Sequence, residues 1–153
     1  MERYQISVVK CEIGSILIYT TSNVCHRIEF SDEDLPSVTS NIFVEQIDEY
    51  LKGRRQILDF PVSYSSGPIF TKVWKYLREN VKYGTIITYG ELAKACGVSP
   101  RIVGYALASN PLPIYIPCHR VVSKSGIGGF SGGNKIRNPI KWKEYLLSLE
   151  GSF

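Results

Sequence analysis

The sequence contains no apolar run that approaches the roughly 20 residues needed to span a membrane. Its first residues, MERYQISVVK, mix acidic, basic and apolar side chains, which is not the pattern of a secretory signal peptide. We therefore expect a cytoplasmic protein that meets no membrane, in a compartment where thiols stay reduced. The chain also lacks the polar bias of a disordered protein, because 44% of its residues are hydrophobic and 21% are charged.

Pairs of cysteines at close spacing are also missing. The cysteines are Cys11, Cys25, Cys96 and Cys118, and none forms the C-x-x-C spacing of zinc ribbons or thioredoxin-type redox sites. Cys25 and His26 are neighbours on an apparent strand, where adjacent side chains point to opposite faces and do not readily share a metal ion. We expect no metal site and no cofactor.

Charge is distributed unevenly along the chain. Residues 1–62 hold six Lys and Arg against ten Asp and Glu, a net charge of −4, whereas residues 63–153 hold twelve against four, a net charge of +8. A basic half joined to an acidic half favours a polyanion as the partner of the basic half. A solvated basic surface without a partner would give the same counts, so charge alone leaves both interpretations open.

Strand-like segments dominate the first half of the chain. Apolar runs bounded by turn residues predict strands at residues 4–9, 15–21 and 24–30. Apolar residues at helical spacing then predict a helix that ends at Gly53, and residues 56–62 predict a last strand. This order indicates a small domain in which a helix packs on a β-sheet.

The polar segment 63–67, with the sequence SYSSG, separates this half from the next, and the net charge changes there. The signals that follow are helical: an apolar stripe over residues 70–77 and a terminal helix capped by Asn138. The sequence therefore predicts an α/β fold of the α+β kind. Its parts are an N-terminal domain over 1–62, a linker over 63–67 and a mostly helical C-terminal domain over 68–153.

Two short helices are predicted in the middle of the C-terminal domain. Thr88 and Glu91 have capping-box spacing, so they predict the start of a helix that stops at Gly97. Ser99 can cap a second helix that runs to about Ser109. Two short helices joined by a glycine-containing turn are typical of a helix-turn-helix, and within a basic domain this favours DNA binding.

The second of these helices has an unusual composition for a helix that recognises DNA bases. It carries one charged residue, Arg101, together with small residues that include Gly104 and Ala108. A helix that reads bases in the major groove normally presents Arg, Asn or Gln. The small residues suit a close approach of the helix backbone to a narrow groove, or they merely permit tight packing between helices.

Cys118 lies in the segment PLPIYIPCHRVV, residues 111–122, among three prolines and next to His119. Each proline fixes its own φ and restricts the preceding residue, so we expect an extended segment that holds the sulfur in place. The alternative is that Cys118 is only a small buried core residue, although such a residue does not need three prolines around it. A reactive cysteine needs a base, for which His119 is the candidate, through a bridging water if necessary, with Glu150 as a candidate to orient it.

Together these segments resemble the methylated-DNA–protein-cysteine methyltransferases, the O6-alkylguanine-DNA alkyltransferases. The resemblance rests on PCHRVV preceded by NPLPIYI, with TYGELA upstream and FSGG and LLSLEG downstream, and it covers about residues 68–151. It implies a DNA repair protein, acting as a monomer, that binds duplex DNA through its helix-turn-helix in the minor groove. The protein would flip an O6-alkylguanine, chiefly O6-methylguanine, into a pocket and move the alkyl group to its own cysteine, once per molecule.

On the matching positions, the resemblance implies a role for each polar residue near the cysteine. Cys118 would be the nucleophile, and His119 and Glu150 would form a water-bridged relay that makes its thiolate. Tyr89 would crowd the target nucleotide and present its hydroxyl to the base. Asn110 would brace the loop that holds the site.

The resemblance also implies contacts with the DNA and with the target base. Arg101 would enter the duplex in place of the extruded base, on the helix that carries Gly104 and Ala108. The guanine pocket would be lined by Pro113, Val121, Phe130 and Ser131. Phe130 stands where the family usually has tyrosine, and residues 134–142 resemble an insertion before the last helix.

Two other functions compete with this interpretation. A cysteine hydrolase would also use Cys118, but such enzymes place the histidine far away in sequence and need an oxyanion hole. A non-enzymatic DNA-binding regulator or alkyl-damage sensor would share the helix-turn-helix. Sensors of this kind resemble the family but replace the reactive cysteine, whereas Cys118 is present here.

Overall fold

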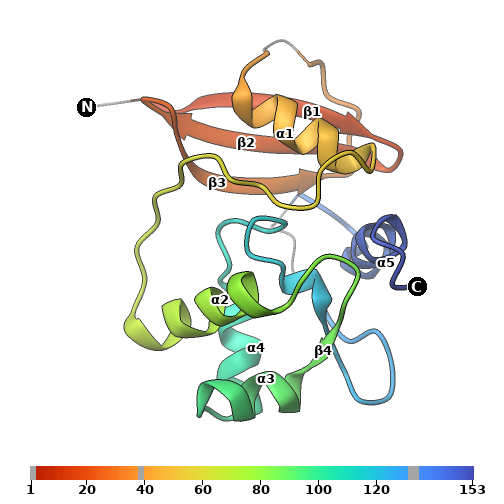
Figure 1. The fold of residues 1–153 in the computed structure, drawn as a ribbon. Helices are drawn as coiled ribbons and strands as arrows, with labels where there is room; N and C mark the ends of the chain where they lie inside the picture. The colour runs from red at the N-terminus through yellow and green to blue at the C-terminus, as the bar shows by residue number, and fades with distance from the viewer. Residues whose placement is uncertain (1–2, 38–39, 131–134) are drawn as a thin grey trace.

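The computed structural model describes residues 3–37, 40–130 and 135–153. The elements of its first half are β1 Gln5–Cys11, β2 Gly14–Thr21, β3 Val24–Ser31 and α1 Ile42–Leu51. The strands form an antiparallel sheet in the order β1-β2-β3, and α1 lies across it (Figure 1). The predicted strands and the helix after them are therefore confirmed. Strand β2 is buried along most of its length, which indicates that the sheet is covered on both faces.

The predicted last strand over residues 56–62 is wrong. This segment makes a single bridge, between Val62 and Cys25 at the edge of β3. Pro61 has no N–H to donate, so the chain cannot continue a regular ladder there. The rest of the segment is held by side chains instead: Gln46 of α1 donates to Asp59 Oδ1 at 2.6 Å and accepts from the Asp59 N–H at 2.9 Å.

The second half is mostly helical, as predicted. Its elements are α2 Pro68–Asn80, β4 Ile87–Thr88, α3 Tyr89–Cys96, α4 Pro100–Ala108, the 3₁₀ turn η1 Cys118–Arg120, β5 Val121–Val122 and α5 Pro139–Leu149. Strands β4 and β5 pair in parallel, with Ile87 opposite Val121. Because α3 begins directly after β4 and η1 ends directly before β5, this short pairing brings Tyr89 and Cys118 to the same place.

Helices α3 and α4 form the predicted helix-turn-helix. The Thr88 side chain accepts from the Glu91 N–H while the Glu91 side chain accepts from the Thr88 N–H, which completes the capping box. Gly97 ends α3 with φ of 69°, a left-handed conformation that glycine adopts without strain. Ser99 caps α4, and Trp74 of α2 donates to the carbonyl of Ala106 at 2.7 Å, which fixes α4 against the core.

Helix α5 joins the two halves. Asn138 caps it as predicted, and Trp142 stacks on Phe30 of β3 with 4.7 Å between ring centroids. The Trp142 N–H also donates to Asp32 at 2.9 Å. Figure 1 shows α5 beside the end of the sheet, with α2, α3 and α4 in a separate layer. Within the described ranges, no helix is long and apolar enough to cross a membrane.

Candidate active site around Cys118

Cys118 begins a single 3₁₀ turn rather than lying in an extended segment, so the expected extended conformation is corrected. The turn is closed by the Arg120 N–H, which donates to the Pro117 carbonyl at 3.1 Å. A proline directly before a helical turn gives up no hydrogen bond, because the first N–H groups of a turn have no partner within it. As a result, Cys118 faces a pocket while the next two side chains are buried behind it.

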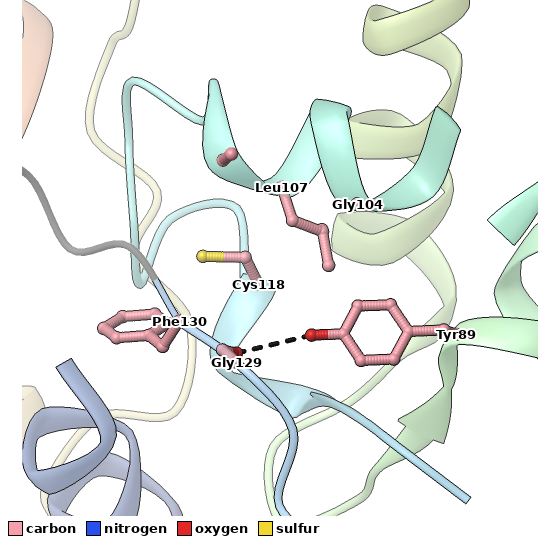
Figure 2. A pocket seen from close by; sticks show the side chains of 7 residues that line it. Tyr89, Gly104, Leu107, Cys118, Gly129 and Phe130 are labelled. Carbon is pink, nitrogen blue, oxygen red and sulfur yellow. Dashed lines mark hydrogen bonds between the residues drawn. The ribbon is translucent and has the colours of Figure 1, made fainter. Parts of the chain in front are cut away.

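The pocket has a volume of about 260 Å³ and lies between α4 and the loop before α5 (Figure 2). It is lined by Tyr89, Gly104, Leu107, Ala108, Cys118, Gly129 and Phe130. Figure 2 shows the Tyr89 ring on one side of the Cys118 sulfur and the Phe130 ring on the other. Tyr89 donates to the carbonyl of Gly129 at 3.4 Å, so the wall opposite α4 is tied to α3.

The loop before Cys118 is fixed by Asn110. Its side chain donates to the carbonyl of Ile116 at 2.9 Å and accepts from the N–H of Leu112 at 2.9 Å. Ile114 lies within this loop at φ of 75°, a conformation that β-branched residues rarely adopt. Such strain persists only where the surrounding structure enforces it, and it is concentrated at functional sites.

A buried polar cluster lies behind Cys118 and is centred on Glu150, which follows α5. His119 Nε2 lies 2.7 Å from Glu150 Oε2, and Arg120 donates to both carboxylate oxygens, at 2.8 and 3.0 Å. The Tyr50 hydroxyl of α1 donates to Oε2 at 2.5 Å, and the Gly84 N–H donates to Oε1 at 3.4 Å. The described residues therefore supply five hydrogen bonds to one carboxylate.

These contacts decide the protonation of the cluster. Burial would raise the pKa of Glu150, but hydrogen bonds from His119 and Arg120 outweigh it and hold this pKa well below its usual range. Burial lowers the pKa of His119 against the opposing effect of Glu150, so His119 is neutral at pH 7. A neutral imidazole that donates from Nε2 keeps Nδ1 unprotonated. His119 Nδ1 is buried and has no hydrogen-bond partner among the described residues.

The thiol itself is protonated at rest. Burial raises the pKa of Cys118 to about 11, although the Asn110 side chain and the charge of Lys143 act in the opposite direction. Burial lowers the pKa of Lys143 to about 8, and the nearby Cys118 raises it. Lys143 Nζ donates to the carbonyls of Val121 at 2.5 Å and Gly129 at 2.8 Å, which ties α5 to both sides of the site.

Residues expected at the guanine pocket are only partly brought together. Phe130 lines the pocket, and Ser131 lies outside the described residues. Pro113 and Val121 are buried and do not line the pocket. For Val121 the reason is the 3₁₀ turn, which directs the chain after Cys118 into the parallel pairing of β5 with β4.

The exposed side of α4 carries the residues expected to meet DNA. Arg101 is exposed and forms no ion pair with any residue that the structure describes. Gly104 and Ala108 line the mouth of the pocket. A methyl group added at Gly104 would meet nothing within 4 Å, so tight helix packing does not explain this glycine.

Sequence reasoning missed six residues of the site: Tyr50, Gly84, Leu107, Arg120, Gly129 and Lys143. Arg120 directly follows the cysteine–histidine pair, but no local pattern predicts its contact with Glu150, which joins positions 30 residues apart. Lys143 lies on the same side of α5 as the buried Leu146 and Leu147, and a lysine at such a position is a signal for a buried charge. The described parts of the chain contain no group of three His, Cys, Asp or Glu side chains that could hold a metal ion.

Comparisons with known proteins agree on one family. Residues 68–152 match the family model of the 6-O-methylguanine DNA methyltransferase DNA binding domain. A methylated-DNA–protein-cysteine methyltransferase of Metallosphaera sedula is 41% identical over 119 residues, which cover 75% of this chain and 72% of the relative. One from Saccharolobus islandicus is 36% identical over 146 residues, which cover 95% of this chain and 88% of the relative.

Solved structures show the same fold. The O6-methylguanine methyltransferase of Mycobacterium tuberculosis superposes with a TM-score of 0.78 at 26% identity, covering 99% of this chain and 94% of that one. A structure of the Mycobacterium tuberculosis OGT in complex with DNA superposes with a TM-score of 0.78 at 28% identity, over 96% of this chain and 93% of that one.

Proposed function

The chain belongs to the methylated-DNA–protein-cysteine methyltransferase family and is a DNA repair methyltransferase, and on this premise we propose that Cys118 is the residue that accepts the methyl group. One observation carries the proposal: Cys118 lines the pocket beside the helix-turn-helix, with a buried histidine–carboxylate pair directly behind it. Cys25 and Cys96 are buried elsewhere in the core, and Cys11 lies on β1.

The reaction is a displacement at saturated carbon. The Cys118 thiolate attacks the methyl carbon of O6-methylguanine in line with the carbon–oxygen bond, and a soft sulfur nucleophile suits this centre. The new sulfur–carbon bond forms as the carbon–oxygen bond breaks. The electron pair of the broken carbon–oxygen bond stays on the O6 oxygen of guanine. The product is a thioether that water does not readily hydrolyse, so each protein molecule reacts once.

The polar cluster generates the thiolate. Because Cys118 is protonated at rest, its proton must leave before or during the attack. His119 accepts it at Nδ1, directly or through a water molecule, and Glu150 stabilises the imidazolium that forms. The positive charge of Lys143 and the hydrogen bond from Asn110 favour the sulfur anion.

Double-stranded DNA carrying O6-alkylguanine is the proposed partner. The exposed residues of α4 are Pro100, Arg101, Tyr105 and Ala108, of which Arg101 alone is charged, so phosphate contacts supply most of the affinity and sequence preference is weak. Arg101 fills the space that the extruded base leaves, and Tyr89 faces the base once it enters the pocket. Gly104 and Ala108 allow the backbone of α4 to come close to the duplex.

The protein is proposed to act as a monomer in the cytoplasm. Cysteines at all four positions are free in the structure, which is compatible with a reducing compartment. The proposed division into domains at residues 63–67 is supported by the lack of helix or strand in this described segment and by the start of α2 at Pro68.

The test is a mass measurement after mixing the protein with a duplex that contains O6-methylguanine. Tryptic mapping should find one methyl group per molecule on Cys118, with no product beyond one equivalent. A methyl group on Cys11, Cys25 or Cys96 instead, or continued turnover, would contradict the proposal. Tight binding without transfer would favour a damage sensor.

A further inference from the structure

A tyrosine of the first half of the chain reaches the polar cluster behind Cys118. The hydroxyl of Tyr50, near the end of α1, donates a hydrogen bond of 2.5 Å to Glu150 Oε2. Only 1% of Tyr50 is exposed, and its ring packs edge-on against Tyr83 with 6.1 Å between centroids. Helix α1 therefore contributes a polar atom to a cluster whose other members come from the second half.

Tyr50 and His119 share one carboxylate oxygen. Glu150 Oε2 accepts from the Tyr50 hydroxyl and lies 2.7 Å from His119 Nε2, while Arg120 Nη2 donates to it at 3.0 Å. Each donor that shares an anionic oxygen reduces the negative charge available to the others. A shared carboxylate consequently polarises the His119 N–H less than an unshared one would, and the far ring nitrogen is less basic.

We infer that Tyr50 is a positioning residue for methyl transfer: its hydroxyl takes a share of Glu150 Oε2, limits the basicity of His119 and thereby sets the pH at which Cys118 becomes a thiolate. The inference rests on the proposed roles of Cys118 and His119. The transferred proton moves from sulfur to His119, and Tyr50 keeps its own proton throughout. Helix α1 thus acts on the reaction without touching substrate.

The other titratable and charged groups around the cluster do not replace Tyr50. Those facing His119, Glu150 and Cys118 are Arg120 of η1, Lys143 of α5, Tyr83 of the loop after α2 and Tyr89 of α3. Arg120 keeps its hydrogen bonds to both carboxylate oxygens when Tyr50 changes, so Glu150 stays ionised. Lys143 bonds main-chain carbonyls.

The decisive variant is Tyr50→Phe, which removes one oxygen and keeps the ring packing. Without the shared hydrogen bond, Glu150 polarises His119 more strongly, so the thiolate forms at lower pH. The reaction of Cys118 with iodoacetamide, followed by peptide mass mapping across pH, should show a midpoint lower by on the order of one pH unit. An unchanged midpoint, or a higher one, overturns the inference.

Tyr83→Phe is the matched control. Tyr83 packs against Tyr50, but its hydroxyl donates to the carbonyl of Leu149 at 3.3 Å and not to Glu150. This variant removes the same atom from the neighbouring ring, and its iodoacetamide midpoint should equal that of the wild-type protein. A shift as large as that of Tyr50→Phe would assign the effect to altered packing and overturn the inference.

A second substitution, which should shift the midpoint in the opposite direction, keeps the test informative if Tyr50→Phe fails to fold. A fluorinated tyrosine introduced at position 50 has nearly the same shape and a more acidic hydroxyl, which donates a stronger hydrogen bond. Glu150 would then polarise His119 less, and the midpoint of the iodoacetamide reaction of Cys118 should move to higher pH. A midpoint that stays in place or falls contradicts the inference.

Two readouts separate this inference from the proposed function. Iodoacetamide reports the thiolate of Cys118 without DNA, whereas methyl transfer from an O6-methylguanine duplex reports the repair reaction. A wild-type protein that transfers no methyl group would refute the proposed function even if Tyr50→Phe shifts the iodoacetamide midpoint. A normal transfer reaction with no shift in the variant would refute the role of Tyr50 alone.

Discussion

The two sides of Cys118 have opposite characters. On the pocket side, small and apolar groups such as Gly104, Leu107 and Phe130 surround open space. On the far side, His119 and Glu150 are buried, and the carboxylate accepts hydrogen bonds from several elements. The pocket side offers room and few fixed contacts, whereas the polar side offers fixed contacts and no room.

This difference separates recognition from activation. A pocket with few polar groups can accept a base that arrives from DNA, because the base itself supplies the contacts that fill it. A relay that moves a proton needs its donors and acceptors within hydrogen-bond reach before substrate arrives. Variants on the two sides should therefore fail in different ways, and the predictions below test that division.

The largest effect is expected where the two sides meet. Cys118→Ser keeps a small side chain at the same place but removes the soft nucleophile, so methyl transfer should fall below detection. Binding to an O6-methylguanine duplex, measured by fluorescence anisotropy, should stay close to that of the wild-type protein. Residual transfer to any other cysteine, detected by peptide mass mapping, would show that the acceptor has been misassigned.

The second largest effect is expected from a substitution in the polar cluster. Glu150→Gln should slow transfer by on the order of a hundredfold, because His119 loses the anion that stabilises its protonated form. It should also reduce the free energy of unfolding by about 3–5 kcal/mol, since Arg120 is left buried without its counter-charge. Single-turnover rates and urea unfolding at pH 7 measure the two effects.

The same variant tests the pH dependence. The pKa of Glu150 is held well below its usual range, so its contribution to stability is present at neutral pH and is lost as pH falls below about 4.3, where the unfolded chain takes up a proton. Wild-type stability should therefore fall more steeply in acid than that of Glu150→Gln. Equal slopes for the two proteins would argue against an ionised Glu150.

Arg101→Ala tests the pocket side on DNA. Extruding a paired base costs a few kcal/mol, and a side chain that fills the gap offsets part of that cost, so repair of duplex should slow by about tenfold. Reaction with free O6-benzylguanine should be unchanged, because no base is extruded. Lys75→Ala on α2, which removes an equal charge, is the control. A wild-type rate at saturating duplex would leave Arg101 only a phosphate contact.

How far the sequence predicts this structure depends on the range of the interactions. The helix-turn-helix was predictable because its caps, Thr88, Gly97 and Ser99, act within a few residues. The polar cluster was only partly predictable, because the hydrogen bond from Tyr50 to Glu150 joins positions 100 residues apart. No local pattern encodes such a contact.

The segment around Cys118 shows the limit of local reasoning from prolines. Three prolines predicted an extended conformation, but Pro117 is also a residue that a 3₁₀ turn accepts at its start. The pairing of β5 with β4 and the buried Arg120 favour the turn, and both depend on contacts distant in sequence. The same turn removes Val121 from the predicted pocket wall.

Lys143 is a basic residue that lies near both the pocket side and the polar side of Cys118. Lys143→Met should slow the reaction of Cys118 at pH 7 by about tenfold, because the thiolate loses a positive charge that Lys143, with its pKa of about 8, carries at that pH. The wild-type protein should also gain stability between pH 8 and about 10.5, where unfolded Lys143 is protonated and folded Lys143, with its pKa of about 8, is not. The variant should lack this gain, and urea unfolding at pH 7.5 and pH 10 compares the two proteins.

The smallest effect is expected from Gly104→Ala, which is also the most specific test of the pocket side. A methyl group there meets nothing within 4 Å, and alanine is favoured over glycine in a helix, so the free energy of unfolding should rise by up to about 1 kcal/mol. The same methyl group narrows the pocket mouth and holds α4 away from the duplex, so repair should slow a few-fold. Gly90→Ala on α3 adds an equally unobstructed methyl group away from the Cys118 pocket and should leave repair unchanged. A Gly104→Ala protein that is more stable and repairs duplex at the wild-type rate would show that close approach of α4 is not needed.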